Sequence, residues 1–175
     1  MRTLVIGGAR SGKSRAAEQL LADAPAATYV ATAYPADHDD EWATRVATHR
    51  ARRPAGWATV ETRDLVGLLG ADGDPLLVDC LTLWLTRAMD GHGCWTDAGW
   101  AAGEAGLRAD VAGLVEALRA TSRDVVLVTN EVGQGVVPES ASGRRFRDEM
   151  GLLNSAVAEA CEDVLWCVAG RVVRL

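Results

Sequence analysis

The stretch that decides the fold is TLVIGGARSGKS, residues 3–14, followed at once by RAAEQLLA, residues 15–22. Residues 3–6 are apolar or β-branched, which is typical of a short buried strand. Residues 7–14 match the pattern GxxxxGK[ST] of a phosphate-binding loop. Apolar residues recur at helical spacing over residues 16–21. A strand, a glycine loop and a helix thus follow in the order that such a loop requires, which argues against a chance match.

Lys13 is the single lysine of the chain, and the other seventeen cations are arginines. A lysine kept in this composition marks a place that needs a compact, mobile ammonium group. Gly7 and Gly12 allow the main chain to approach a phosphate closely, Lys13 would reach the β and γ phosphates, and Ser14 would ligate Mg²⁺. The pattern therefore predicts that the following residues bind nucleotide: Gly7, Gly8, Ala9, Arg10, Ser11, Gly12, Lys13 and Ser14.

Length and composition favour one compact domain spanning residues 1–175, with 49% hydrophobic residues to build a core. A net charge of −6 argues against nucleic acid as a partner, because that function needs a basic face. No window resembles a membrane span or a signal peptide, so we expect a cytoplasmic protein. The four cysteines lack metal-ligand spacing and are expected to be reduced thiols.

Short apolar runs alternate with helical patterns along the chain, which indicates a mostly parallel sheet covered on both faces by helices. The last two runs are separated by Ala169 and Gly170 and predict an antiparallel hairpin at one sheet edge. The predicted strands are 4–6, 28–31, 76–78, 125–128, 164–168 and the terminal residues 171–175. The predicted helices are 13–22, 39–53, 82–90, 100–121 and 143–161, and residues 90–99 are expected to form a loop.

Ligands of such sheets bind beyond the carboxyl ends of the strands, so polar residues at those ends are candidates. Asp79 follows an apolar strand and suits a role in holding Mg²⁺; its alternative role is to cap the next helix. Asn130 and Glu131 follow another strand. Glu131 could serve the metal, orient a substrate hydroxyl or act as a base, or it could be an ordinary loop acid.

A second cluster lies in DDEWATRVATHRARRP, residues 39–54. On a helix, Arg45, His49 and Arg53 are four residues apart and share a stripe with Arg52. Like charge around the imidazole would lower its pKa and leave a neutral nucleophile, while the arginines could bind phosphate oxygens. The spacing by itself favours a solvated basic helix face with an ordinary surface histidine, so this cluster alone leaves the role of His49 open.

Several motifs together resemble one family across essentially the whole chain. They are GGARSGKS, the histidine in RVATHRARRP, WATVE, LLVDCLTLWLT, VVLVTNEVGQGVVPES and GRRFRDEMGLLN. In this order they resemble the bifunctional adenosylcobinamide kinase and adenosylcobinamide-phosphate guanylyltransferase of cobalamin biosynthesis. The resemblance implies a RecA-like P-loop fold, a homotrimer, and Mg²⁺ with GTP and ATP as substrates.

The resemblance also implies roles for particular residues. A nucleoside triphosphate would phosphorylate adenosylcobinamide, and GMP would then pass from GTP through a covalent GMP-histidine at His49 to adenosylcobinamide phosphate. Further nucleotide contacts would come from Thr32, Ala33, Tyr34, Arg50, Ala51, Arg52, Arg53, Glu61 and Asp79. The chain has Arg87 where many members have asparagine, and Asp79 where some have glutamate.

Two other functions fit the phosphate loop. A monofunctional small-molecule kinase would form ADP on a hydroxylated substrate and no covalent nucleotide. A nucleotide-dependent regulatory switch would bind a partner and would need no small acceptor. Neither needs a nucleophile inside a basic stripe, so the surroundings of His49 separate them from the bifunctional enzyme.

Overall fold

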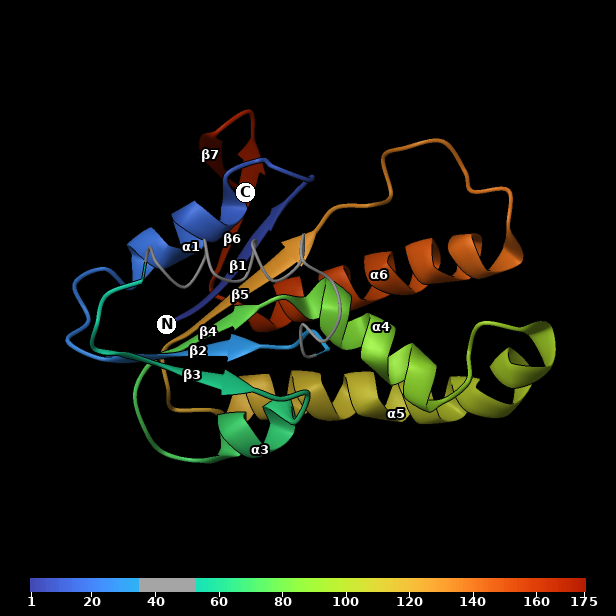
Figure 1. Ribbon diagram of the computed structural model, residues 1–175, viewed down its shortest axis with the longest axis horizontal. Helices are drawn as coiled ribbons and strands as arrows, with labels where there is room; N and C mark the ends of the chain where they lie inside the picture. The colour runs from blue at the N-terminus through green and yellow to red at the C-terminus, as the bar shows by residue number, and fades with distance from the viewer. Residues whose placement is uncertain (35–52) are drawn as a thin grey trace.

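Strands and helices alternate along the chain as predicted, and the computed structural model describes residues 1–34 and 53–175 (Figure 1). The predicted helix 39–53 lies outside the described residues except for its last position. The strands are β1 (Arg2–Gly7), β2 (Ala27–Ala31), β3 (Trp57–Glu61), β4 (Leu76–Asp79), β5 (Val125–Asn130), β6 (Asp163–Val168) and β7 (Arg171–Arg174). The helices are α1 (Lys13–Leu20), α3 (Leu65–Gly70), α4 (Leu81–Gly91), α5 (Asp97–Ala120) and α6 (Ala141–Ala160).

The strands form one seven-stranded sheet in the order β3-β2-β4-β5-β1-β6-β7. Every neighbouring pair is parallel except β6 and β7, which form the predicted antiparallel edge hairpin. Strand β5 lies between β1 and β4, with Gly7 opposite Asn130 and Asp79 opposite Val128. The end of β5 therefore separates the phosphate loop from the carboxylate at the end of β4.

The two faces of the sheet carry separate cores. Alternate strand residues such as Val5, Leu77 and Val126 pack with α1 on one face. Their neighbours Leu4, Leu76 and Leu127 pack with α3, α4, α5 and α6 on the other face. Because strands in the middle of the sheet are buried on both faces, they are apolar at every position, as β5 shows over Val125–Val128.

Sequence patterns missed strand β3 and helix α3. Strand β3 is at the sheet edge, and its central residues are exposed or partly exposed, so it lacks a continuous apolar run. Helix α3 has six residues, LVGLLG, and is too short to show helical periodicity. It is held by its N-cap, because the Asp64 carboxylate accepts a hydrogen bond of 2.8 Å from the Gly67 N–H.

The predicted loop at residues 90–99 is much shorter in the structure. Helix α4 continues to Gly91, and α5 already begins at Asp97, capped by the Thr96 hydroxyl. The glycines here are packing positions: a Cβ on Gly99 would lie 1.9 Å from the Gly93 carbonyl oxygen, and one on Gly103 would lie 2.2 Å from that of His92. Glycine thus marks close contact between α5 and the preceding turn.

None of the four cysteines forms a disulfide in the structure. Within residues 1–34 and 53–175, no helix has the length and apolar character needed to cross a bilayer.

Candidate functional site

The phosphate-binding loop connects β1 to α1 with the geometry of an anion site. Gly12 has φ of +95°, which favours glycine, and it is the N-cap of α1 without any side-chain cap. The Lys13 ammonium donates a hydrogen bond of 3.1 Å to the Gly8 carbonyl oxygen, so it lies over the loop. Ser14 is partly exposed in the first turn of α1. Uncapped backbone N–H groups, the helix dipole and one ammonium together favour a bound phosphate.

The first glycine of the loop is required by close packing against β6. A Cβ on Gly7 would lie 2.5 Å from the Cys167 carbonyl oxygen and 2.6 Å from the Ser11 Oγ. The β6–β7 turn supports the loop from the same side, because the Gly170 N–H donates to the Ser11 carbonyl oxygen at 3.1 Å. A Cβ on Gly8, in contrast, would have no atom within 4 Å. The loop is therefore fixed from behind by the sheet and open around Gly8.

Asp79, at the end of β4, interacts with Tyr29 of β2. Burial and then the Asp79 carboxylate raise the pKa of Tyr29. The Arg53 guanidinium lies 3.4 Å from the centroid of the Tyr29 ring and donates a hydrogen bond of 2.9 Å to the Thr59 Oγ1. Tyr29 packs in the core shared with α1. Tyr29, Asp79 and Arg53 therefore lie on the face of the sheet that carries the phosphate helix.

The structure does not support the alternative role of Asp79 as the cap of α4. The N-cap of α4 is Cys80, and it makes no side-chain cap hydrogen bond. Asp79 is only partly buried, so its carboxylate, which interacts with Tyr29, is also accessible to a ligand. Glu61, at the exposed end of β3, is in register with Ala31, which is in register with Asp79. Two strand spacings thus separate the two acids, about 10 Å across the sheet.

The residues after β2 are tied to α4. The Thr32 hydroxyl is fully buried; it donates to the Cys80 carbonyl oxygen at 2.6 Å and accepts from the Cys80 N–H at 3.0 Å. Arg87 of α4 donates to the carbonyl oxygens of Thr32 and Ala33 at 3.1 and 3.0 Å, which gives this unusual arginine a structural role. Because the Thr32 hydroxyl is engaged within the protein, it is not free to contact a nucleotide.

Asn130, at the end of β5, is held by neighbours on both sides. Its backbone N–H and its side-chain Nδ2 each donate to the Thr82 Oγ1 at 3.0 Å. Its carbonyl oxygen accepts from the Asn154 Nδ2 at 3.1 Å, and the Asn154 Oδ1 accepts from the Thr129 hydroxyl at 2.7 Å. The amide of Asn130 is therefore oriented, beside the phosphate loop, by helices α4 and α6.

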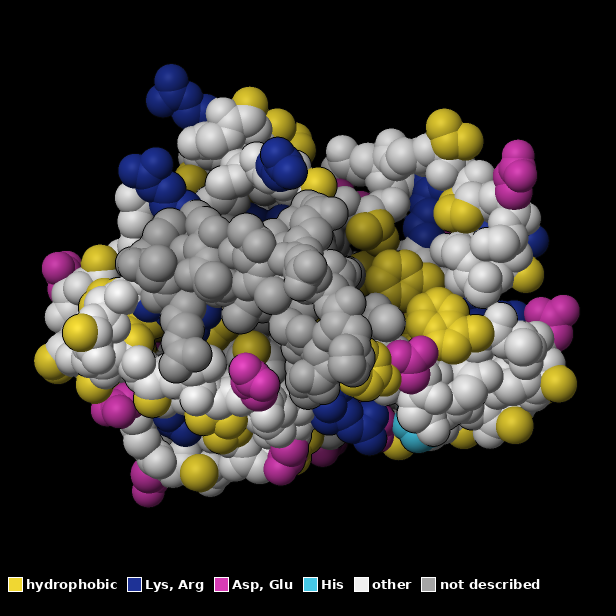
Figure 2. All heavy atoms as spheres, viewed as in Figure 1, with side chains coloured by type: hydrophobic (Ala, Val, Ile, Leu, Met, Phe, Trp, Pro, Cys, Tyr) yellow, Lys and Arg dark blue, Asp and Glu magenta, His cyan; other side chains and the backbone are white. Residues whose placement is uncertain are grey.

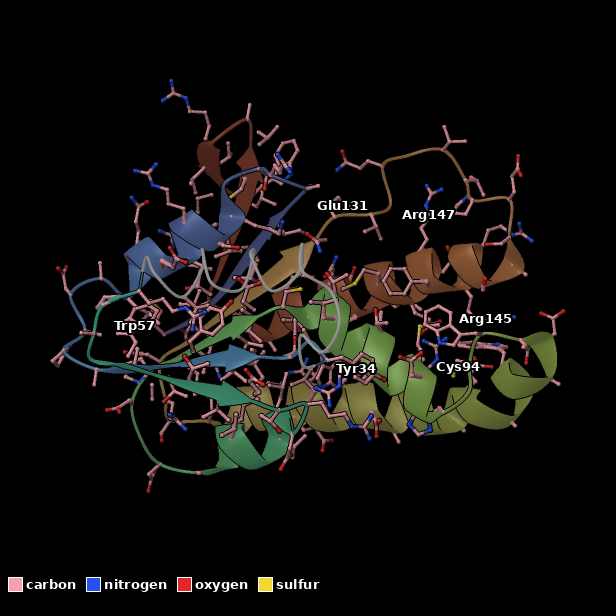
Figure 3. All side chains as sticks on the ribbon, viewed as in Figure 1. Tyr34, Trp57, Cys94, Glu131, Arg145 and Arg147 are labelled. Atoms are coloured by element: carbon pink, nitrogen blue, oxygen red, sulfur yellow. The ribbon has the colours of Figure 1, made fainter. Side chains whose placement is uncertain are left out.

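Glu131 has a local partner. Its carboxylate accepts a hydrogen bond from the Gly133 N–H, and its own N–H donates to the Gly7 carbonyl oxygen at 3.2 Å. Arg147 of α6 donates to the Gly133 carbonyl oxygen. Figure 3 shows Glu131 on the connection from β5 to α6 and Arg147 reaching from α6 toward that connection. Of the roles considered for Glu131, these contacts support that of a loop acid that shapes the turn.

Four predicted site residues, His49, Arg50, Ala51 and Arg52, lie outside the described residues. Arg53 is described, and it lies over Tyr29 beside Asp79 as given above. Among residues 1–34 and 53–175, no three His, Cys, Asp or Glu side chains come together as a metal cluster. A divalent ion held by the Ser14 hydroxyl and the Asp79 carboxylate would thus need oxygens from phosphates and water to complete its shell, as Mg²⁺ commonly does.

Sequence reasoning missed Tyr29, Thr82 and Asn154. Tyr29 lies inside a predicted strand, Thr82 at the start of a predicted helix and Asn154 within one, so the patterns predict each only as part of an element. The available signal was polarity at a buried position: Asn154 is 7% exposed inside an apolar helix face. Buried amides need partners, and Asn154 could have been expected to bind a neighbouring strand end.

Comparisons with known proteins agree across the whole chain. The family model CobU, cobinamide kinase / cobinamide phosphate guanyltransferase, matches residues 3–175. The bifunctional adenosylcobalamin biosynthesis protein CobP of Pseudomonas aeruginosa is 45% identical over 175 residues, covering 97% of this chain and 94% of that protein. The bifunctional adenosylcobalamin biosynthesis protein CobU of Salmonella typhimurium is 41% identical over 182 residues, covering 100% of this chain and 99% of that protein.

A solved structure supports the fold. An ATPase from the type III secretion system of pathogenic bacteria superposes with a TM-score of 0.60 at 11% identity, covering 94% of this chain and 50% of that chain. At this identity the likeness concerns the fold alone, and it agrees with the predicted mostly parallel sheet covered by helices.

Proposed function

This chain belongs to the cobinamide kinase / cobinamide phosphate guanyltransferase family, and from that premise we propose that it phosphorylates adenosylcobinamide with ATP or GTP and then converts the product to adenosylcobinamide-GDP with GTP. The observation that carries the proposal is the intact phosphate loop, with Lys13 over Gly8 and an uncapped α1. Residues 1–175 would act as one domain, in the cytoplasm, where nucleoside triphosphates are available, and as the trimer that the family resemblance implies.

In the kinase step, the hydroxyl oxygen of adenosylcobinamide attacks the γ phosphorus, the hydroxyl proton passes to water, and the bond from the γ phosphorus to the β-phosphate oxygen breaks. The backbone N–H groups of residues 8–14 and the Lys13 ammonium would stabilise the charge that moves onto the leaving diphosphate. When bound, Mg²⁺ would neutralise charge on the phosphate oxygens. Ser14 and Asp79 are the residues that would hold it, since both offer oxygen donors and Asp79 is not used as a helix cap.

In the transfer step, we propose that an imidazole nitrogen of His49 attacks the α phosphorus of GTP and pyrophosphate leaves. A phosphate oxygen of adenosylcobinamide phosphate then attacks the same phosphorus, and the phosphorus–nitrogen bond breaks. Two displacements replace one direct reaction between anions. The arginines that follow the histidine, at 50, 52 and 53, would bind the phosphate oxygens, and Arg53 is already positioned on the face that carries α1.

The test is the intact mass of the protein after incubation with GTP and Mg²⁺. A mass gain equal to one GMP, labile in acid and stable in base, is expected in the natural sequence and absent from His49→Ala. The control is Lys13→Ala, which should lose both the adduct and the kinase reaction. If no adduct forms while GTP binds and adenosylcobinamide is phosphorylated, the chain is a monofunctional kinase.

The metal assignment has its own test. Asp79→Asn keeps the shape of the side chain and removes its charge. We expect the Mg²⁺ concentration for half-maximal kinase activity to rise several-fold. Asp72→Asn, at an exposed position before the opposite end of β4, serves as the matched control. An unchanged Mg²⁺ titration for Asp79→Asn would remove this carboxylate from the metal site.

A further inference from the structure

Three aromatic side chains, Tyr34, Trp95 and Phe146, form a connected array around Asp90 of α4 and are called the aromatic wall below. The Tyr34 hydroxyl donates to the Asp90 Oδ2 at 2.8 Å, and the Trp95 Nε1–H donates to the Asp90 Oδ1 at 2.6 Å. One carboxylate of α4 therefore holds two rings that come from different loops. The Trp95 and Phe146 rings lie 6.1 Å apart between centroids, with an angle of 32° between their planes.

The hydrogen-bonding groups of the aromatic wall are bonded within the protein, whereas its ring surfaces are partly accessible. The Tyr34 hydroxyl and the Trp95 Nε1–H both donate to Asp90. The Arg87 guanidinium lies 4.9 Å from the centroid of the Tyr34 ring. Yet Tyr34 is 52% exposed, and Trp95 and Phe146 are only partly buried. Fixed rings with satisfied edges and accessible surface favour a ligand that presents a flat, apolar face.

The wall is connected at both ends to the phosphate site. Tyr34 follows Thr32, whose hydroxyl is bonded to Cys80, the residue after Asp79. On the other side, Phe146 precedes Arg147, which bonds Gly133 in the connection that begins with Glu131, and Glu131 bonds Gly7. Figure 2 shows hydrophobic side chains gathered in a hollow beside the lobe on the right. The ends of α5 and α6 form that lobe in Figure 1.

We propose that the aromatic wall binds the flat face of the corrin macrocycle of adenosylcobinamide, with the acceptor hydroxyl turned toward the phosphate loop. This proposal rests on the proposed function. Three rings from three segments offer more surface than one nucleoside base covers, and Trp95 and Phe146 lie outside every predicted nucleotide contact. An acceptor much larger than its reacting hydroxyl needs such a surface to position that hydroxyl by contacts remote from it.

The experiment measures kinase kinetics with adenosylcobinamide as the varied substrate at saturating GTP. Trp95→Ala and Phe146→Ala should each raise the KM for adenosylcobinamide roughly tenfold, as loss of an aromatic contact does. GTP affinity, measured by calorimetry, should change by less than about twofold. Trp95→Phe keeps a ring and should stay within about threefold of the natural sequence. Leu152→Ala, at a 51% exposed position on the same helix as Phe146, is the matched control and should have no effect.

The other possible results of this experiment each overturn a different part of the proposal. An unchanged KM in both alanine variants, with phosphorylation intact in the natural sequence, rejects the wall and leaves the proposed function standing. A natural sequence that binds GTP but neither binds nor phosphorylates adenosylcobinamide rejects the function itself. Weaker GTP binding assigns the rings to the nucleoside, and a changed oligomeric state with unchanged KM assigns them to a subunit interface. If an alanine variant does not fold, Trp95→Phe with Phe146→Leu decides: an unchanged KM for Phe146→Leu rejects the wall.

Discussion

The phosphate loop and the neighbouring strand ends differ in how their polar groups are used. In the loop, α1 begins without a side-chain cap, and Lys13 bonds only its own loop carbonyl among the hydrogen bonds described. At the strand ends, Thr32 and Asn130 are bonded to other parts of the protein, and Asn154 of α6 bonds the end of β5. Groups left open can be used by a ligand, whereas groups bonded internally stabilise the fold. The difference separates binding residues from positioning residues in one small region.

The strongest test of this comparison is Lys13→Ala. If the ammonium serves the ligand, kcat/KM for the triphosphate should fall by about 100-fold or more, while the free energy of unfolding changes by less than about 0.5 kcal/mol. Arg15→Ala, an exposed cation on the same helix, is the control and should keep its activity. Steady-state kinetics and urea unfolding provide the two measurements. A large loss of stability in Lys13→Ala would place the lysine among the structural groups.

Gly7 and Gly8 test the same comparison within the loop, because Gly7 packs against the rest of the fold and Gly8 has open space around it. Gly7→Ala places a Cβ 2.5 Å from the Cys167 carbonyl oxygen, and we expect a loss of about 2–3 kcal/mol in the free energy of unfolding. Gly8→Ala meets no atom within 4 Å, so stability should hold while the added methyl weakens nucleotide binding. Urea titration and nucleotide calorimetry on both variants test this. Equal stability of the two variants would contradict the packing argument.

Asn154 of α6 bonds Thr129 and Asn130 at the end of β5, so its replacement tests the structural role of the strand ends. Asn154→Leu leaves the Thr129 hydroxyl and the Asn130 carbonyl without their partner, which should cost about 1–2 kcal/mol in the free energy of unfolding. Nucleotide affinity should change less, because Asn154 lies behind the site. Ser155→Ala, exposed on the same helix, should be neutral in urea unfolding. A loss of affinity without loss of stability would move Asn154 into the binding group.

The last prediction changes no residue and concerns the Cys80 thiol. Burial first, and then Asp79, raise the pKa of Cys80 from 9.0 to about 11. Only thiolate reacts with alkylating reagents, so at pH 8 the folded protein should hold about 100-fold less thiolate at this residue than the unfolded chain. Because the pKa is raised on folding, this reactivity gap stays full below pH 9 and closes as pH rises toward 11. Mass-spectrometric mapping of iodoacetamide labelling across that range measures it, and rapid labelling of folded Cys80 at pH 8 would contradict its burial.

Much of the fold could be predicted because its signals are local. Strands β1, β4, β5 and β6 are apolar runs, and α5 and α6 begin and end within three residues of their predicted bounds. Prediction failed where the signal depends on a neighbour. Strand β3 is exposed along its edge, and Gly99 was interpreted as a loop residue although its missing side chain admits the Gly93 carbonyl oxygen. Close contacts of this kind do not show in periodicity.

The sequence by itself determined the phosphate loop, because its eight residues are contiguous and covalent geometry sets their spacing. It also determined which residues end the buried strands, including Asp79 and Asn130. Only the tertiary structure decided that β5 lies between β1 and β4, and that Thr82 orients Asn130 while Thr32 holds Cys80. These partners are 48 residues apart in both pairs, so hydrogen bonding between them depends on strand order, which emerges only when the sheet assembles.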